Sequence, residues 1–145
     1  MSQSMSRTEM PTPEPQTEPD NETFWRAAGE GRFVIPRCVE CAELIWIPRS
    51  FCPRCMGKTE WVELSGRATI YSYTEVHRGD GAYAATGPFV LAYVELAERG
   101  IRIMTNIVDS PAGELRIGQE VEAVFHPAGK ETGVPRFRPV REEPR

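Results

Sequence analysis

The sequence contains few of the residues that most often bind metals or transfer protons: four cysteines and two histidines occur among 145 residues. It has no run of about eighteen apolar residues, so no segment reads as a membrane-spanning helix. It also lacks the Gly-x-Ser-x-Gly motif of serine hydrolases and the Gly-x-x-x-x-Gly-Lys-Ser/Thr motif of phosphate-binding loops. The sequence therefore carries no signature of these two enzyme classes.

Charge is distributed unevenly along the chain. Residues 1–22 hold Arg7 against five acidic side chains, a net charge of −4, whereas residues 23–145 hold 16 basic and 16 acidic side chains. The N-terminus has neither the basic start nor the apolar run of a secretory signal. We therefore expect a cytoplasmic protein with reduced thiols. We also expect residues 1–21, which are acidic and contain four prolines, to form a disordered tail.

All four cysteines lie in one short stretch, as the pairs Cys38-x-x-Cys41 and Cys52-x-x-Cys55. Two disulfides would suit a small secreted chain, and a redox dithiol usually comes as a single pair at the start of a helix. Two pairs separated by ten residues instead offer four thiolates to one tetrahedral metal. Zinc suits this ligand set, and iron in a rubredoxin-like site would use the same residues. The pattern predicts a structural metal with no open coordination position, zinc in preference to iron.

The remaining pattern is that of a mainly β protein. Asn21 can cap a short helix over residues 22–28, which Gly29 to Gly31 can end. After the cysteine ribbon, alternating apolar residues predict five strands: Gly66–His77, Phe89–Leu96, Ile101–Val108, Glu120–His126 and Arg136–Val140. A long first strand and the lack of long helices fit a five-stranded OB-fold barrel, with an SH3-like barrel or an open sandwich as alternatives.

These patterns divide the chain into five parts. We expect a tail over residues 1–21, a helix over 22–32, a zinc ribbon over 33–63, an OB-fold over 64–141 and a second tail over 142–145.

Five segments are distinctive in combination: "GEGRFVIPRC", "IPRSFCPRC", "WVELSGRATIYSYTEVHR", "PFVLAYVEL" and "IGQEVEAVF". Together they resemble the DUF35 family, in which a rubredoxin-like zinc ribbon is joined to an OB-fold in acyl-CoA-associated proteins. The resemblance covers roughly Phe24 to Val140. Many ribbons share the cysteine spacing, so the conjunction of motifs carries the specificity. One departure is Ala42, where such knuckles often have glycine.

The resemblance implies a non-catalytic accessory subunit or domain. Its partner would be a thiolase-like enzyme, or a MaoC-like hydratase, in lipid or steroid side-chain metabolism. Its role would be to help form or feed the CoA-thioester site of that enzyme. The residues point the same way: His77 and His126 each end an expected strand, and Glu75 and Glu95 could work together only if neighbouring strands aligned them.

Two sets of residues are candidates for contacts with ligand and partner. The phosphates of CoA could be held by Arg49, Arg54, Arg67 and Arg78, although each could equally be a solvated charge or compensate the negative metal site. A protein partner could contact Ile45, Trp46 and Tyr83. Core packing is an equal claim for Trp46, and Tyr83 lies in the glycine-rich segment "RGDGAYAATGP", which could simply be a flexible loop.

The alternative function is binding of single-stranded nucleic acid, because zinc ribbons and OB-folds both bind it in basic grooves with stacking aromatics. The ribbon stretch Arg32–Arg67 holds six basic residues against four glutamates, a net of only +2. A neutral body with an acidic tail does not attract a phosphate polymer as a basic domain would. The sequence therefore favours the accessory role.

Overall fold

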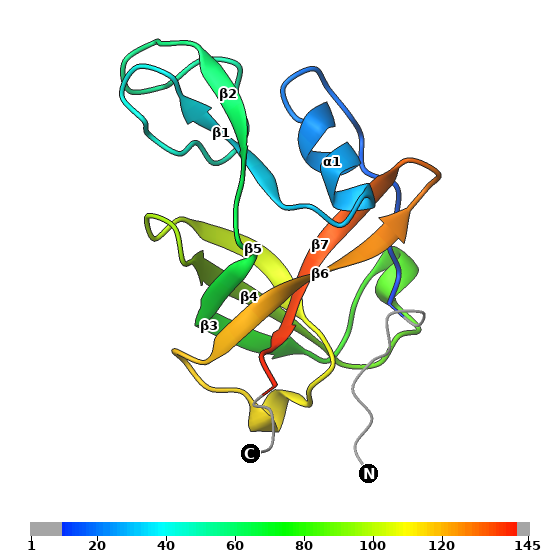
Figure 1. Ribbon diagram of the computed structural model, residues 1–145. Helices are drawn as coiled ribbons and strands as arrows, with labels where there is room; N and C mark the ends of the chain where they lie inside the picture. Colours follow the sequence, from blue (N-terminus) through cyan, green and yellow to red (C-terminus); the bar gives the residue numbers. More distant parts are fainter. Residues whose placement is uncertain (1–9, 142–145) are drawn as a thin grey trace.

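The computed structural model describes residues 10–141 of the protein (Figure 1). A helix, α1, is followed by a two-stranded ribbon sheet and a five-stranded barrel. The elements are α1 (Glu22–Gly29), β1 (Val34–Cys38), β2 (Thr59–Glu63), β3 (Arg67–Val76), η1 (Gly81–Tyr83), β4 (Phe89–Leu96), β5 (Arg102–Ile107), η2 (Ala112–Glu114), β6 (Glu120–Ala128) and β7 (Thr132–Pro139). The second tail expected over residues 142–145 lies outside the described residues.

The barrel closes in the strand order β3-β4-β5-β7-β6. Adjacent strands in this order pair antiparallel, except β5 and β7, which pair in parallel. The prediction of a mainly β protein with a short helix, a four-cysteine ribbon and a five-stranded barrel is confirmed.

Strand β7 differs most from its expected bounds, because it begins at Thr132 rather than at Arg136. The cause is the β6–β7 hairpin, in which Pro127 pairs with Gly133 and Phe125 pairs with Pro135. Proline donates no ladder hydrogen bond and usually argues against a strand. Pro127 and Pro135 therefore concealed the outer part of this hairpin in the sequence.

Alternation along the strands separates the barrel interior from its surface. In β4 the buried side chains are those of Val90, Ala92, Val94 and Leu96, whereas Leu91 and Tyr93 face outward. The interior also receives Phe137 from β7, which is fully buried. Burial of this apolar set is the main favourable term for the barrel.

Helix α1 packs against β7 through its buried Phe24, Ala27 and Ala28. The two backbones come close, since a Cβ placed on Gly133 would lie 2.7 Å from the carbonyl oxygen of Ala28. Asn21 precedes the helix but does not cap it with its side chain. Its Oδ1 instead accepts a hydrogen bond from the backbone N–H of Glu18 at 2.8 Å. Among residues 10–141, no helix has the length and apolar character needed to cross a membrane.

Residues 10–21, which the sequence analysis expected to form part of a disordered tail, follow a defined path along the barrel (Figure 1). Met10 is 4% exposed and packs with Val108 and Val124, and Tyr83 and Phe89 complete this second apolar cluster. The sequence suggested too little apolar surface to offset ordering. The barrel, however, provides a site that buries a single methionine almost completely. Residues 1–9 lie outside the described part of the chain.

We expect Met10→Ala to destabilise the packing of the N-terminal segment, because replacing a buried methionine by alanine removes about 2 kcal/mol or more of burial and packing free energy. The melting temperature should fall, and the amides of the β3–β4 loop should exchange faster with solvent. Gln16→Ala is the matched control, since Gln16 is exposed. Equal melting temperatures for the two variants would show that Met10 contributes nothing to stability.

Candidate metal centre and junction cleft

The four cysteines lie on two knuckle turns at the tip of the ribbon. In the first turn the N–H groups of Glu40 and Cys41 each lie 3.4 Å from the Sγ of Cys38. In the second turn the N–H of Arg54 lies 3.4 Å from the Sγ of Cys52. Ala42 and Met56 occupy equivalent places with positive φ of 63° and 64°. Ala42 thus adopts the left-handed conformation for which glycine is usually preferred.

The four sulfur atoms converge to within 4.8 Å of one another. Sγ of Cys38 lies 3.4 Å from that of Cys55, and Sγ of Cys41 lies 3.7 Å from that of Cys52. A disulfide requires about 2.05 Å, whereas the edge of a tetrahedral ZnS₄ site is about 3.8 Å, given Zn–S bonds of about 2.3 Å. The residues therefore fit a single tetrahedral metal ion.

At Cys38 the backbone of the knuckle favours the thiolate form that a metal requires, whereas the neighbouring thiols and burial raise the pKa of Cys41 and Cys55. The N–H of Cys41, followed by that of Glu40, lowers the pKa of Cys38 to about 7. Thiolate sulfur is thereby stabilised at the base of the site by hydrogen bonds from the main chain.

Gly57 lies so close to the sulfur cluster that its position has no room for a side chain. A Cβ at this position would lie 2.9 Å from the Sγ of Cys38 and 3.3 Å from that of Cys55. A side chain here would therefore push against two of the four sulfur atoms.

Ile45, an expected interface residue, lies inside the ribbon. It is 3% exposed and packs with Cys38 and Cys52, which form a small core of their own. The exposed apolar residues of the ribbon are instead Val39, Ile47, Phe51 and Met56. Ile47 and Met56 are 66% and 70% exposed.

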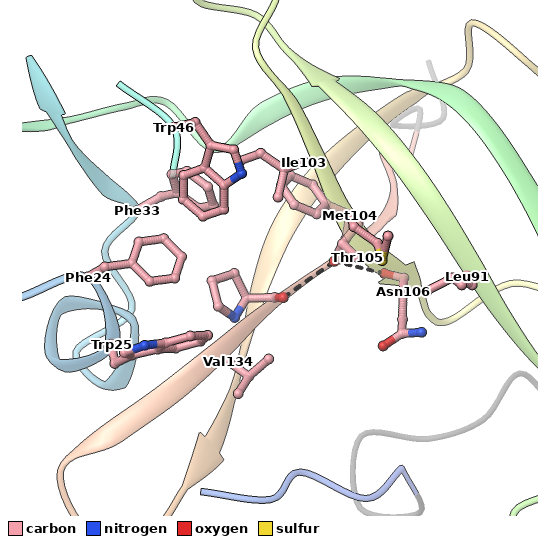
Figure 2. A pocket seen from close by; sticks show the side chains of 12 residues that line it. Phe24, Trp25, Phe33, Trp46, Leu91, Ile103, Met104, Thr105, Asn106 and Val134 are labelled. Carbon is pink, nitrogen blue, oxygen red and sulfur yellow. Dashed lines mark hydrogen bonds between the residues drawn. The ribbon is translucent and has the colours of Figure 1, made fainter. Parts of the chain in front are cut away.

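Trp46 stands where the ribbon, α1 and the barrel meet. Its ring packs edge-on against Phe24, with ring centroids 5.2 Å apart. Below it lies an open cleft of about 240 Å³, bounded by the ribbon, α1 and the barrel (Figure 2). Trp46 thus packs against the core cluster and also lines the cleft. Its contact with a protein partner stays a prediction. The cleft is lined by Phe24, Trp25, Phe33, Trp46, Leu91, Ile103, Met104, Thr105, Asn106, Val134, Pro135 and Phe137.

The outer face of β3, β4 and β5 carries large apolar side chains that the sequence analysis did not single out. Tyr93 and Met104 are cross-strand partners and are 42% and 56% exposed. Beside them, Tyr71 is exposed and its ring lies 3.8 Å beneath the guanidinium of Arg102. The signal that could have identified them is the stretch "PFVLAYVEL", which is apolar on both faces although only one face of a small barrel is buried.

Tyr83, the third expected interface residue, lies on η1 in the β3–β4 loop and is half-buried. Its ring packs against Phe89, with centroids 5.3 Å apart. Its hydroxyl donates a hydrogen bond to the carbonyl oxygen of Pro11 at 3.2 Å. This loop is therefore held against the N-terminal segment.

The four candidate CoA-binding arginines do not converge. Arg67 and Arg78 lie at and just beyond the two ends of β3, which is ten residues long, a span of roughly 30 Å. Arg54 pairs with Glu43 at 3.3 Å, and Arg67 pairs with Glu122 at 3.8 Å. Arg49 is an exposed residue of the ribbon.

The groups considered for proton transfer lie apart from the cleft. His77 and Glu75 form an exposed pair, with Nε2 and Oε1 3.2 Å apart. Glu95 pairs with Arg102 at 3.1 Å on the outside of the barrel. His126 is buried and its Nδ1 lies 2.6 Å from Nη1 of Arg136. No two of these groups face each other across the cleft.

Fold and site together define a class of protein in which a four-cysteine ribbon is docked through a helix onto an OB-fold barrel. The sequence matches two family descriptions that divide at the same point. Residues 25–62 match the ChsH2 rubredoxin-like zinc ribbon domain, and residues 61–126 match the ChsH2 C-terminal OB-fold domain. The chain belongs to the DUF35 family.

Individual relatives show how this architecture is used. The chain is 38% identical over 104 residues to a DUF35 domain-containing scaffold protein of Methanocaldococcus jannaschii, covering 70% of this chain and 73% of that protein. It is 37% identical over 129 residues to a probable enoyl-CoA hydratase alpha subunit of Thermomonospora curvata, covering 88% of this chain and 40% of that protein.

A solved structure described as an Ltp2-ChsH2(DUF35) aldolase contains a similar chain. The two chains superpose with a TM-score of 0.78 and are 35% identical, covering 87% of this chain and 98% of that one.

We expect Cys52→Ala to release the metal and loosen the ribbon, because its core is too small to hold the hairpin without the metal. Metal content per chain and the melting temperature should both fall. Ser50→Ala, two residues away on the exposed surface, is the matched control. Retention of one metal ion per chain by Cys52→Ala would refute the four-thiolate site.

Gly57→Ala should weaken the metal site without removing a ligand, since the added Cβ would lie too close to two sulfur atoms. A chelator competition measured at equilibrium should show lower metal affinity than in the unaltered chain. Gly113→Ala is the control, because a Cβ at Gly113 meets no atom within 4 Å. Equal affinities for the two variants would contradict this account of the knuckle.

Proposed function

We propose that the protein is a non-catalytic accessory subunit or domain that supports a thiolase-like enzyme, or a MaoC-like hydratase, acting on an acyl-CoA thioester in lipid or steroid side-chain metabolism. In this role it helps to form or feed the CoA-thioester site of its partner. The names of its relatives, a scaffold protein, a hydratase subunit and a component of an aldolase, support this proposal.

The observation that carries the proposal is the apolar surface of the barrel beside the cleft. Met104 lines the cleft and pairs with Tyr93 in the neighbouring strand, and both side chains are largely exposed. Exposed clusters of aromatic and methionine side chains are typical of protein interfaces. The partner would cover this face and so close the open side of the cleft.

The placement of the arginines fits a shared CoA site better than a complete one. Arg54 and Arg67 are held by glutamates, which leaves Arg49 and Arg78 without an ion pair among the described residues. Arg49 belongs to the ribbon and Arg78 to the β3–β4 loop, at separate places on the molecule (Figure 1). Either could contribute one phosphate contact to a site completed by the partner.

For the metal, we propose zinc. Four thiolates in tetrahedral geometry suit zinc, and the ion would hold the two knuckles together without an open position for a substrate. Cys38, Cys41, Cys52 and Cys55 would be its ligands.

Nucleic-acid binding receives no support from the barrel surface. Arg102 pairs with Glu95 and Arg138 pairs with Glu122, at 3.1 and 3.3 Å. A groove for single-stranded nucleic acid needs unpaired basic residues along the strand path. On the described barrel surface these glutamates offset the arginines.

We expect Met104→Glu to weaken the complex with the partner enzyme about tenfold or more, because a carboxylate would have to be desolvated in an apolar interface. Candidate thiolases and hydratases identified by copurification from the native source would be titrated against the purified chain. Ile117→Glu is the matched control, since Ile117 is 62% exposed in the segment before β6 and does not line the cleft.

The isolated chain should turn over no CoA thioester, and the partner should gain rate, affinity or solubility when the chain is added. Equal binding by the Met104→Glu and Ile117→Glu variants would exclude this face as the interface. Thioester turnover by the isolated chain, abolished by His77→Gln, would make the protein an enzyme instead.

A further inference from the structure

Arg136 is a buried arginine outside the metal centre and the cleft. It lies on β7, its residue exposure is 3%, and it lies among the outer residues of the barrel beneath the N-terminal segment. Arginine is rarely this buried unless a carboxylate pairs with it. The groups around Arg136 therefore indicate which kind of ligand this part of the surface would bind.

Within residues 10–141, the Arg136 guanidinium forms hydrogen bonds with amide, carbonyl, hydroxyl and imidazole groups and with no carboxylate. Nε donates to Oδ1 of Asn106 at 3.3 Å, and Nη2 donates to the carbonyl oxygen of Pro11 at 2.7 Å. Nη1 donates to the hydroxyl of Thr12 at 2.8 Å and lies 2.6 Å from Nδ1 of His126. Because the guanidinium has only donors, Nδ1 is the acceptor and its ring proton lies on Nε2.

Within residues 10–141, no carboxylate lies within 4.0 Å of the Arg136 guanidinium. Burial correspondingly lowers the pKa of Arg136, although a guanidinium remains charged at neutral pH. A buried cation without a counter-charge is costly, and an anion in good geometry would relieve that cost. As far as the described residues show, the site thus lacks one negative charge.

The same groove recognises the main chain and an apolar side chain. Met10 fills the apolar seat formed by Val108 and Val124. The carbonyl oxygen of Pro11 accepts hydrogen bonds from both Tyr83 and Arg136. Grooves that bind an extended peptide use the same three features. These are a pocket for an apolar side chain, hydrogen bonds to a main-chain carbonyl, and a contact to a polar side chain one residue further on.

We propose that the groove beneath residues 10–14 is a peptide-binding site, occupied in cis by the chain's own N-terminal segment. It binds more tightly an extended acidic peptide that places a carboxylate where the Thr12 hydroxyl now lies. Such a peptide carries an apolar residue two positions before an aspartate. Glu14 does not supply the charge, because its carboxylate lies beside Gly129.

The first experiment introduces the missing charge into the full chain. Thr12→Asp places a carboxylate beside Arg136, and Thr12→Asn is the neutral control of nearly equal size. The melting temperature of the aspartate variant should exceed that of the asparagine variant by about 3 °C or more, as expected for one charge-assisted hydrogen bond. In an Arg136→Met background the difference should vanish. An aspartate variant no more stable than the asparagine variant would overturn the proposal, whether or not Arg136→Met folds.

The second experiment tests binding in trans by fluorescence anisotropy. The full chain carrying Met10→Ser, which weakens the hold on its own segment, is titrated with the labelled peptides Met-Pro-Asp-Pro-Glu and Met-Pro-Asn-Pro-Glu. The aspartate peptide should bind about tenfold more tightly, since hydrogen bonds to charged groups are the stronger ones. Equal affinities, or no binding of either peptide, would overturn the proposal. Neither experiment uses a partner enzyme, so failure here leaves the proposed function untested and unaffected.

Discussion

The ring of Phe24 belongs to a chain of aromatic contacts that runs from the ribbon to the barrel. It packs edge-on against Trp46 of the ribbon and Phe33 of the connecting segment, with centroids 5.2 and 5.8 Å apart, and Phe33 continues to Phe137 of the barrel at 6.1 Å. Such edge-to-face pairs add about 0.5–1.5 kcal/mol each beyond the apolar area that they bury. Ile35 of the ribbon belongs to the same core cluster as the barrel residues, and Leu44 and Trp61 pack against that cluster. These contacts and the chain of rings together hold the ribbon beside the cleft.

The metal centre and the aromatic chain have complementary roles. Four thiolates in one tetrahedral site would hold the two knuckles together, and they leave no coordination position for a substrate. With no open coordination position, the metal site would stabilise the structure of the ribbon and would not act as a reactive centre. The ribbon displays Ile47 and Met56, the barrel displays Tyr93 and Met104, and Met104 also lines the cleft. Exposed apolar surface of this kind is typical of protein interfaces.

The N-terminal segment shows how composition can mislead when long-range partners are unknown. Acidic residues and prolines predict disorder, because such a segment has little apolar surface to bury. Met10 is nevertheless buried in an apolar cluster. The carbonyl oxygen of Pro11 accepts one hydrogen bond from the β3–β4 loop and one from β7. Those partners lie 72 and 125 residues away in the sequence. No local pattern reveals them.

The sequence by itself determined the features that depend on spacing: the four-thiolate set, the short helix, the alternating strands and, from these, the ribbon-plus-barrel fold. Tertiary structure alone decided which side chains face outward or converge. Ile45 became ribbon core, Tyr83 was held by Pro11, and Arg67 and Arg78 were separated by the length of β3. Arg136 was buried with no carboxylate paired to it among residues 10–141. The physical reason is that spacing fixes local geometry, whereas burial and convergence depend on contacts between residues far apart in the chain.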